Sequence, residues 1–332
     1  MKVSFRTKYG PPEVLRIKET EIPIVKDDEV LIKVYAATVN RSDCHILTGK
    51  PRIMRLFTGL LKPKLLTTGT DFAGQVETTG KNVTSFKTGD KLMGFSGGLF
   101  GISSHAQYIV LPEAKAIKIT VPIPGNLKYE EAAACLEGAF YAAGNTLLNP
   151  TAGQKALVYG ATGAIGSSYV QFLKYYGVYI TAVCRGEHAD LVKSLGADKV
   201  IDYTKEDFSK DTDRYDFVFD AVGKSSFAKC KPLLKKKGIF TSSGGAENLL
   251  LVFITPLFGG KKVVFKSYGS IKAGLSFIKK LIEEGHFKPV IDRKYPLDKI
   301  AEAFAYVISG QKIGKQFPIL KYRIDRVAKK AG

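Results

Sequence analysis

The segment Lys155–Gly177 constrains the fold more than any other part of the chain, because it predicts a strand, a glycine-rich turn and a helix in succession. Its first residues, Ala156–Tyr159, form a short apolar run beside a glycine, which is typical of a buried strand. Glycines follow at Gly160, Gly163 and Gly166, and apolar residues then recur at close to helical spacing. This order of elements predicts a dinucleotide-binding site.

The glycines of this turn suit the approach of a charged ligand. Gly160 permits the tight turn after the strand, and Gly163 lets the backbone come close to a pyrophosphate. The free N–H groups and the dipole at the start of the following helix stabilise such a group. A glycine triplet alone also occurs in ordinary loops, so the flanking strand and helix carry the prediction. The expected nucleotide contacts in this turn are Gly160, Thr162, Gly163, Ala164, Ile165 and Gly166.

Further strand and helix units after Gly177 favour a doubly wound α/β domain. The predicted second strand, Val178–Cys184, is followed by Arg185. Domains of this kind that bind NAD tend to end this strand with an acid for the ribose hydroxyls, whereas an arginine accommodates the 2′-phosphate of NADP. Arg185 therefore favours NADP(H) as the cofactor, although the acid Glu187 lies close by in the sequence.

Length, composition and charge indicate the size class, the compartment and the kinds of partner to expect for the protein. The chain of 332 residues exceeds one ordinary domain, and its 45% hydrophobic content is typical of a soluble globular protein. It has no apolar signal core and no run near the ~20 apolar residues of a membrane span. The four cysteines lack zinc or disulfide spacing, which predicts a cytoplasmic setting. The net charge of +19 suits nucleic acid, an anionic membrane or an acidic ligand, but the lysines are spread out, which favours a solvated basic surface.

Residues 1 to about 120 contain strand-like runs separated by turn residues, which predicts a β-rich region. Three of its segments are VNRSDCHILTG (Val39–Gly49), GTDFAGQVETTG (Gly69–Gly80) and FKTGDKLMG (Phe86–Gly94). Together with the nucleotide fold, they resemble the zinc-independent quinone oxidoreductase branch of the medium-chain dehydrogenase/reductase superfamily. The resemblance covers nearly the whole chain.

This resemblance implies an α/β protein with a doubly wound Rossmann domain and a β-rich GroES-like catalytic domain. The GroES-like domain is expected at residues 1–121, completed by residues 286–332, and the Rossmann nucleotide-binding domain is expected at residues 122–285. Pro122-Ile123-Pro124-Gly125 marks the crossing between the two domains, and a single helix is predicted over residues 130–148.

Zinc ligands are replaced in the segments that carry the resemblance. Zinc alcohol dehydrogenases of that superfamily have a cysteine where this chain has Asn40, and Gly-His-Glu where it has Gly69-Thr70-Asp71. Catalytic zinc needs about three protein ligands at an open tetrahedral site, and an amide and a hydroxyl are poor ligands. The lobe that normally holds structural zinc corresponds to Gly97–Gly101, which has no cysteine. We therefore predict that the protein binds no metal.

The resemblance also implies which residues surround the nicotinamide. Asn40 and Asp43 are expected to line it from the catalytic domain. The family has a small polar residue, usually threonine, in the first helix of the nucleotide domain, and Tyr141 stands at that position here. Its phenol can donate a hydrogen bond or a proton, and burial for packing is the alternative. The other implied cofactor contacts are Tyr203 and Lys315 near the phosphate of the adenosine, and Val222, Gly223 and Ser243 at the ends of later strands.

Two apolar segments contain cations or are followed by them. Pro51–Thr68 is interpreted either as a lid or membrane-contacting element, or as a loop packed on its own domain. Leu249–Phe258, the most apolar run, is interpreted as a wall of the substrate site, as a subunit contact of a homodimer, or as buried core. Weak peripheral binding to an anionic membrane is expected if both segments are exposed, and packing of both is the alternative.

These observations predict an NADPH-dependent, metal-free oxidoreductase that transfers hydride to a small-molecule quinone or a conjugated enone or alkenal. Without a Lewis acid to stabilise an alkoxide, alcohol oxidation is disfavoured. Hydride addition to a quinone or enone instead gives a delocalised anion that a few hydrogen bonds stabilise. The alternatives are an alcohol or aldehyde oxidoreductase of the same superfamily and a non-enzymatic nucleotide- or RNA-binding protein, and no specific nucleic-acid partner is expected.

Overall fold

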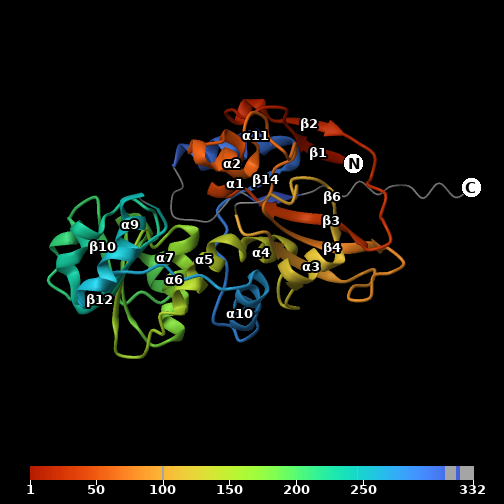
Figure 1. Ribbon diagram of the computed structural model, residues 1–332. Coiled ribbons are helices and arrows are strands. Elements are labelled where there is room, and N and C mark those ends of the chain that lie inside the picture. The colour runs from red at the N-terminus through yellow and green to blue at the C-terminus, as the bar shows by residue number, and fades with distance from the viewer. Residues whose placement is uncertain (99–100, 245, 311–318, 322–332) are drawn as a thin grey trace, which may run out of the picture. The chain divides into compact units, whose positions relative to one another are not determined.

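The computed structural model describes residues 1–98, 101–244, 246–310 and 319–321, which form two compact units (Figure 1). Unit 1 comprises residues 1–136, 293–310 and 319–321, and unit 2 comprises residues 137–292. Each unit has its own main sheet and its own buried apolar side chains. The α/β class predicted from the sequence is confirmed.

Unit 2 is built on a six-stranded parallel sheet with the strand order β10-β9-β8-β11-β12-β13. In open sheets of this kind, ligands bind at the carboxyl ends of the strands where the order reverses, which here lies between β8 and β11. The doubly wound Rossmann fold that the glycine turn predicted is therefore confirmed. The strands are β8 (Lys155–Tyr159), β9 (Tyr179–Cys184), β10 (Lys199–Asp202), β11 (Tyr215–Asp220), β12 (Leu234–Ser242) and β13 (Lys262–Val263).

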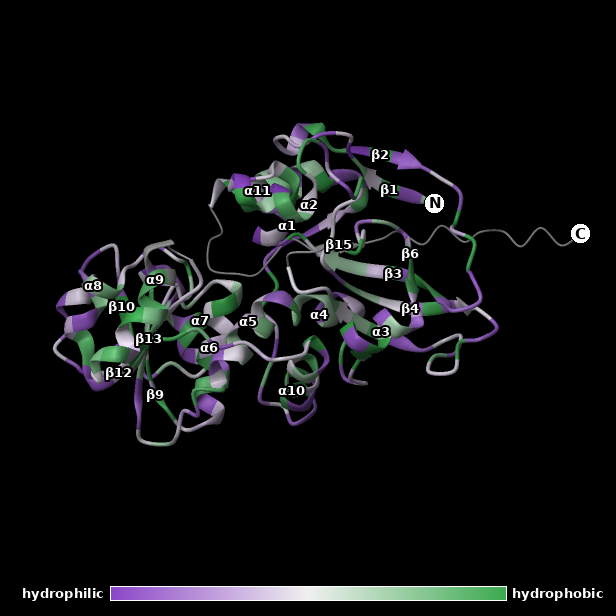
Figure 2. Cartoon of the chain, viewed as in Figure 1, coloured by the Kyte–Doolittle hydropathy of each residue, from purple (hydrophilic) through white to green (hydrophobic). Residues whose placement is uncertain are grey.

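The central parts of most strands of this sheet are apolar runs, as in β8 and β9, and Figure 2 shows the sheet as mainly hydrophobic. A parallel sheet that is buried on both faces requires apolar residues on both sides of each strand, so apolar and polar residues do not alternate along it. Leu157, Val183, Val218 and Phe240, from four different strands, are fully buried in one cluster. The helices of the unit are α5 (Glu137–Thr146), α6 (Ala164–Tyr175), α7 (Ala189–Ser194), α8 (Phe227–Cys230), α9 (Ala246–Ile254) and α10 (Ile271–Glu283).

Unit 1 contains a mostly antiparallel sheet with the order β14-β15-β3-β4-β5-β7, and β6 also pairs with β3. This is the predicted β-rich GroES-like fold, which is confirmed. Its strands are β3 (Glu29–Thr38), β4 (Asp71–Thr79), β5 (Lys91–Phe95), β6 (Tyr108–Pro112), β7 (Thr120–Pro122), β14 (Lys294–Pro296) and β15 (Ile319–Lys321), and β1 (Lys2–Phe5) with β2 (Arg16–Glu19) forms a separate pair. Its helices are α1 (Arg41–Thr48), α2 (Arg55–Thr58), α3 (Glu113–Ile119), α4 (Tyr129–Ala134) and α11 (Ile300–Ser309).

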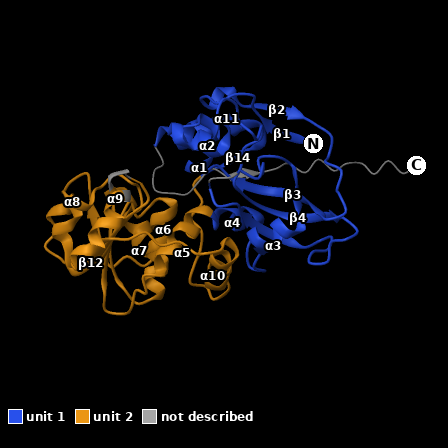
Figure 3. Cartoon of the chain, in the orientation of Figure 1, with its two compact units in different colours: residues 1–136, 293–311, 317–332 blue, residues 137–292, 312–316 orange. Residues whose placement is uncertain are grey.

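The prediction of a single helix over residues 130–148 is wrong, because the segment forms two separate helices, α4 and α5. α4 packs on β3 and β4 of unit 1, whereas α5 packs on α6 of unit 2 (Figure 3). Between them, the N–H groups of Cys135 and Leu136 bond to the carbonyl oxygens three residues back, at 3.3 Å each. The alanine-rich sequence favours helix on both sides of this break, so only the packing of the two halves on different units explains it.

The most apolar run, Leu249–Phe258, forms most of α9 and the 3-10 turn η6 (Thr255–Phe258). Leu251 and Val252 pack against the core of unit 2. Burial as core is one of the three interpretations of this run, and it is wrong for the side chains that do not pack on the core. The exposed apolar side chains of the run are Leu250, Phe253, Ile254, Leu257 and Phe258. Among the helices of the described residues, none is long and apolar enough to cross a membrane.

The start of α6 depends on a close approach that only glycine allows. A Cβ on Gly166 would lie 2.1 Å from the carbonyl oxygen of Gly160, whereas one on Gly163 would meet nothing nearer than that oxygen at 3.5 Å. We predict that Gly166→Ala lowers the free energy of unfolding by about 1–3 kcal/mol, as overpacking does, and that Gly163→Ala costs less. Thermal or urea denaturation measures both variants. Equal stability of the two would contradict the close packing of α6 on the turn.

Candidate functional site

The residues predicted to contact the cofactor gather at one edge of the unit 2 sheet. The carboxyl ends of parallel strands meet at one edge of a sheet, and this is where doubly wound folds bind ligands. Of the predicted residues, Lys315 lies outside the part of the chain that the structure describes. Gly160, Thr162, Gly163, Ala164, Ile165 and Gly166 follow β8, Arg185 follows β9, Tyr203 follows β10, Val222 and Gly223 follow β11, and Ser243 follows β12.

The glycine turn packs tightly against the sheet at Gly160 and has open space beside Gly163. Gly160 has a φ of 80°, and its N–H and that of Ala161 donate to the carbonyl oxygen of Val183 at 3.0 and 3.2 Å. A Cβ on Gly160 would lie 2.1 Å from Cγ2 of Val222, so no other residue fits there. Gly163 is the N-cap of α6 and has no close neighbour where a side chain would point. A helix N-terminus with space in front of it can accept a phosphate group.

Asp220, which the sequence analysis did not assign to the site, organises the loop opposite this turn. It ends β11 and is only 1% exposed. Its Oδ1 accepts from the N–H groups of Val222 and Gly223 at 3.0 and 2.8 Å, and its Oδ2 accepts from the N–H of Ser225 at 2.8 Å and the hydroxyl of Ser242 at 3.0 Å. One buried carboxylate therefore fixes the loop after β11 and the end of β12. A charged residue at the end of an apolar strand is the signal that indicates such a role.

Arg185 and Tyr203 lie side by side, although they are distant in sequence. The parallel pairing of β9 and β10 sets Cys184 against Asp202, and Arg185 Nε then donates to the Tyr203 hydroxyl at 3.1 Å. This hydrogen bond, together with the charges of Tyr203 and Glu187, raises the pKa of Arg185. Glu187 lies 3.7 Å from the guanidinium, and the Arg185 side chain is 53% exposed. An exposed guanidinium beside a phenol is well suited to a phosphate.

Tyr141 lies in α5 and is half-buried. Gly138, one helical turn earlier, packs on the start of α6, since a Cβ there would lie 2.6 Å from Cβ of Ala164. α5 is thereby fixed beside the first turn of the helix that follows the glycine turn. The Tyr141 ring packs edge-on against Phe140, with the ring centroids 6.1 Å apart. The role of Tyr141 as a hydrogen-bond donor stays a prediction.

In unit 1, the predicted residues Asn40 and Asp43 belong to one buried hydrogen-bond network with Asp71. Asn40 precedes α1, and its N–H donates to Asp43 Oδ2 at 2.8 Å, while its Nδ2 donates to Asp71 Oδ2 at 2.7 Å. Asp71 also accepts from the N–H and the hydroxyl of Thr38, at 2.8 and 2.5 Å. Asn40 is fully buried, and its side chain also takes part in a capping box with the backbone of Asp43. The network therefore holds together the end of β3, the start of β4 and the start of α1.

Burial sets the charge states in this network. It raises the pKa of Asp71 to about 6, and the hydrogen bonds from Thr38 and Asn40, which favour the carboxylate, oppose the rise. His105 Nε2 lies 2.9 Å from the carbonyl oxygen of Thr38, and Nδ1 lies 2.7 Å from the Thr68 hydroxyl. Because a carbonyl only accepts, Nε2 carries the proton. Burial lowers the pKa of His105 to about 4, so this side chain is neutral.

The residues that the family resemblance aligns with zinc ligands form hydrogen bonds with one another. Asn40 Nδ2 lies 3.4 Å from the Thr70 hydroxyl, and Asp71 already accepts three hydrogen bonds. Within the described ranges, no cluster of three or more His, Cys, Asp and Glu side chains is arranged to hold a metal ion. All four cysteines are buried, and none of them forms a disulfide. The absence of zinc stays a prediction.

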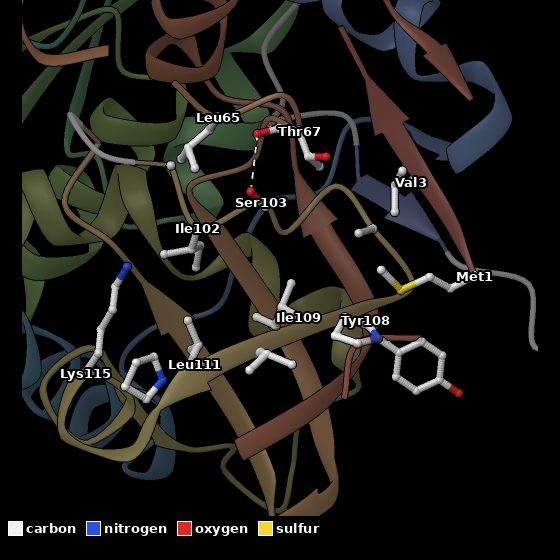
Figure 4. Close-up of a pocket in the computed structure, with 15 residues that line it drawn as sticks. Met1, Val3, Leu65, Thr67, Ile102, Ser103, Tyr108, Ile109, Leu111 and Lys115 are labelled. Atoms are coloured by element: carbon white, nitrogen blue, oxygen red, sulfur yellow. Dashed lines mark hydrogen bonds between the residues drawn. The ribbon is translucent and has the colours of Figure 1, made fainter. Parts of the chain in front are cut away.

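Unit 1 also has a surface pocket of about 310 Å³ (Figure 4). Its walls are mainly apolar, and none of the residues predicted to contact cofactor or substrate lines it. Besides Lys115, the lining includes Val3, Leu65, Ile102, Ile109 and Leu111. The pocket therefore has no part in the site assembled from the sequence.

Family models match both parts of the chain. The model of the alcohol dehydrogenase GroES-like domain matches residues 26–122. The model described as zinc-binding dehydrogenase matches residues 195–316. The two matches agree with a GroES-like unit 1 and a nucleotide-binding fold in unit 2.

Similar proteins extend along nearly the whole chain. A 2-methylene-furan-3-one reductase of Solanum lycopersicum is 34% identical over 328 residues, covering 95% of this chain and 78% of the relative. An NADPH-dependent alkenal/one oxidoreductase, chloroplastic, of Arabidopsis thaliana is 33% identical, with the same two coverages of 95% and 78%. The structure of the quinone oxidoreductase from Coxiella burnetii has the same fold, with a TM-score of 0.81 at 24% identity and coverage of 97% of this chain and 99% of that one. The chain therefore belongs to the medium-chain dehydrogenase/reductase superfamily, in its quinone oxidoreductase branch.

Proposed function

We propose that this oxidoreductase binds NADPH at the carboxyl edge of the unit 2 sheet and reduces a quinone or a conjugated enone or alkenal. One observation carries the proposal: the glycine turn, the start of α6 and the Arg185–Tyr203 pair lie at the carboxyl edge of the sheet, after the neighbouring strands β8, β9 and β10. Two relatives are named as a 2-methylene-furan-3-one reductase and an NADPH-dependent alkenal/one oxidoreductase, which supports this substrate class and this cofactor.

The residues at this edge fit a nicotinamide dinucleotide phosphate. Space beside Gly163 and the N–H groups at the start of α6 suit the pyrophosphate. Arg185, with Tyr203 beside it, suits the 2′-phosphate, because a guanidinium forms strong charge-assisted hydrogen bonds with phosphate oxygens. The fixed loop at Val222-Gly223 suits the ribose of the nicotinamide. Lys315 stays a proposed second cation for the phosphate.

The bound nicotinamide supplies a hydride to an electron-poor carbon. The protein then has to stabilise the negative charge that develops on the oxygen of the substrate. We assign the Tyr141 phenol as the donor to that oxygen. Asn40 and Asp43 are proposed to line the nicotinamide.

An alcohol or aldehyde oxidoreductase is the second candidate, because one matching family model is that of the alcohol dehydrogenase GroES-like domain. Metal-assisted alcohol oxidation uses a Lewis acid to stabilise the alkoxide. This chain has Asn40 and Thr70 in place of two of the ligands, so we favour quinone or enone reduction. Membership of the superfamily also favours an enzyme over a protein that only binds nucleotide or RNA.

The protein's assembly, location and domain division stay proposals. The exposed apolar face of α9 and η6 lies next to the edge strand β13, which suits a homodimer. The cytoplasmic location and the domain division at residues 121/122 and 285/286 rest on the sequence. Weak peripheral contact with a membrane is the remaining proposal.

We predict that Arg185→Ala raises the Kd for NADPH about tenfold or more and leaves the Kd for NADH nearly unchanged. A hydrogen bond to a charged group contributes about 1.5–3 kcal/mol, and only NADPH carries the phosphate. Fluorescence titration with each cofactor measures both constants. Arg214→Ala is the matched control, because Arg214 precedes β11 at the opposite edge of the sheet. Equal weakening of both cofactors would mean that Arg185 does not recognise the phosphate.

Metal content provides a second test. The purified protein should contain no stoichiometric zinc, because Asn40 and Thr70 replace two ligands and no cysteine lobe is present in the sequence. Treatment with a chelator should then leave NADPH oxidation unchanged. Elemental analysis that finds about one zinc per chain would overturn the metal-free assignment.

The role of Tyr141 is tested by removing its hydroxyl alone. If the phenol donates to the developing oxyanion, Tyr141→Phe should lower kcat about 10²-fold with an enone substrate and leave the Kd for NADPH unchanged. Tyr175→Phe, a change on the partly exposed end of α6, is the matched control. An unchanged kcat would assign Tyr141 to packing only.

A further inference from the structure

In the segment of residues 52–66 of unit 1, called here the 52–66 loop, most large apolar side chains are exposed and several small residues are buried. It contains η2 (Arg52–Met54), α2 and the turn after them. Thr58, Gly59 and Pro63 are buried, while Leu60 is 66% and Leu61 is 87% exposed. The exposed large apolar side chains of the loop are Ile53, Leu56, Phe57, Leu60, Leu61, Leu65 and Leu66. The interpretation of this segment as a packed loop is therefore wrong for these side chains.

Hydrogen bonds to the interior fix the 52–66 loop in this conformation. The Tyr9 hydroxyl donates to the carbonyl oxygen of Gly59 at 2.6 Å and lies 2.8 Å from the Thr58 hydroxyl. The N–H of Lys64 donates to the carbonyl oxygen of Thr58 at 2.8 Å and closes the turn. Gly59 has a φ of 121°, and a Cβ there would lie 2.0 Å from the carbonyl oxygen of Lys62, so the turn needs glycine. The leucines thus face outward from an ordered turn.

Arg6 and Arg55 hold the loop to the rest of unit 1. The N–H of Arg6 donates to the carbonyl oxygen of Leu66 at 2.9 Å. The buried Arg6 guanidinium donates to the carbonyl oxygens of Ile46 and Leu47 in α1, at 2.7 and 2.8 Å. The Arg55 guanidinium lies over the Tyr9 ring, 4.8 Å from its centroid. Substituting an outward leucine leaves all of these contacts in place.

The charged residues that flank the exposed leucines in the sequence have one sign. Between Asp43 and Asp71 the sequence has no acidic residue, while its cations there are Lys50, Arg52, Arg55, Lys62 and Lys64. Lys62 and Lys64 are exposed on the same turn as Leu60 and Leu61. An exposed segment that combines projecting apolar side chains with cations and contains no acidic residue is complementary to an anionic lipid headgroup layer.

We propose that the 52–66 loop is a peripheral membrane-docking surface for anionic lipid. Leu60 and Leu61 enter the boundary between headgroups and acyl chains, and Lys62 and Lys64 contact the phosphates. Protein partners are less well matched, because protein interfaces are depleted in lysine and their binding hot spots are rarely leucine. The proposal does not depend on hydride transfer. If the proposed function is correct, docking would also bring the enzyme to lipophilic quinones that are dissolved in the membrane.

Co-sedimentation with vesicles tests the docking surface. The protein should sediment with phosphatidylcholine vesicles that contain phosphatidylglycerol, much less with phosphatidylcholine alone, and binding should fall steeply as salt rises. Leu60→Ser with Leu61→Ser should weaken partitioning about tenfold or more, from the loss of apolar burial. Lys62→Gln with Lys64→Gln should weaken it by a similar factor on anionic vesicles only.

Matched controls keep the test specific. Ile24→Ser changes an apolar side chain of unit 1 that is 92% exposed outside the loop, and Lys87→Gln removes an exposed cation elsewhere in the same unit. Both controls should bind vesicles like the unchanged protein, and thermal denaturation should show all variants folded. Protein that stays in the supernatant with anionic vesicles at low salt would overturn the proposal. Equal binding by the leucine variant, or self-association that the leucine substitutions abolish without any vesicle binding, would overturn it as well.

Discussion

The contact between Gly166 and the carbonyl oxygen of Gly160 is the constraint on which the nucleotide-binding unit depends. It lets α6 begin directly against the turn that ends β8, and this sets the helix N-terminus at the carboxyl edge of the sheet. A second close approach, between Gly138 and Ala164, fixes α5 and with it Tyr141 beside the same helical turn. Asp220 fixes the loop on the other side of the strand-order reversal through four hydrogen bonds. Two close glycine contacts and one buried carboxylate thus shape the edge of the sheet where we propose that the cofactor binds.

The other unit shows how a family site changes when its metal ligands are replaced. Asn40, Thr70 and Asp71 stand where zinc enzymes of the superfamily carry their ligands, and here Asn40 donates to the other two. Burial raises the pKa of Asp71 to about 6, but three donors still favour its charged form. A buried carboxylate with this number of partners holds the end of β3 and the start of α1 together. These residues therefore have a structural role in unit 1, and the absence of metal there stays a prediction.

Much of this arrangement could be predicted from the sequence because its signals are local. The glycine spacing after an apolar run predicted β8, the turn and α6, and the apolar strands predicted the parallel sheet. The contacts that join distant segments could not be predicted in the same way. Asp220 binds N–H groups whose positions depend on the fold of the loop, and the break between α4 and α5 follows from packing on different units. The outward leucines of the 52–66 loop depend on Tyr9, which lies far away in the sequence.

The contact between Arg185 and Tyr203 could be predicted only in part from the sequence. Both residues were predicted to contact the cofactor, but their hydrogen bond follows from the register of β9 against β10, which the sequence does not specify. The position of Lys315 relative to them falls outside the described residues. The sequence thus indicates candidate phosphate-binding residues, and the strand register determines which of them lie side by side.

The central claim is that the protein delivers hydride from NADPH to the electron-poor carbon of a conjugated acceptor. It is tested most directly by following deuterium from NADPH that carries deuterium at both C4 positions of the nicotinamide into a simple enone, with the product analysed by NMR and mass spectrometry. The account predicts one deuterium on the β-carbon of a saturated ketone. Deuterium on the carbonyl carbon of an allylic alcohol, or no transfer from NADPH to any quinone or enone, would contradict it.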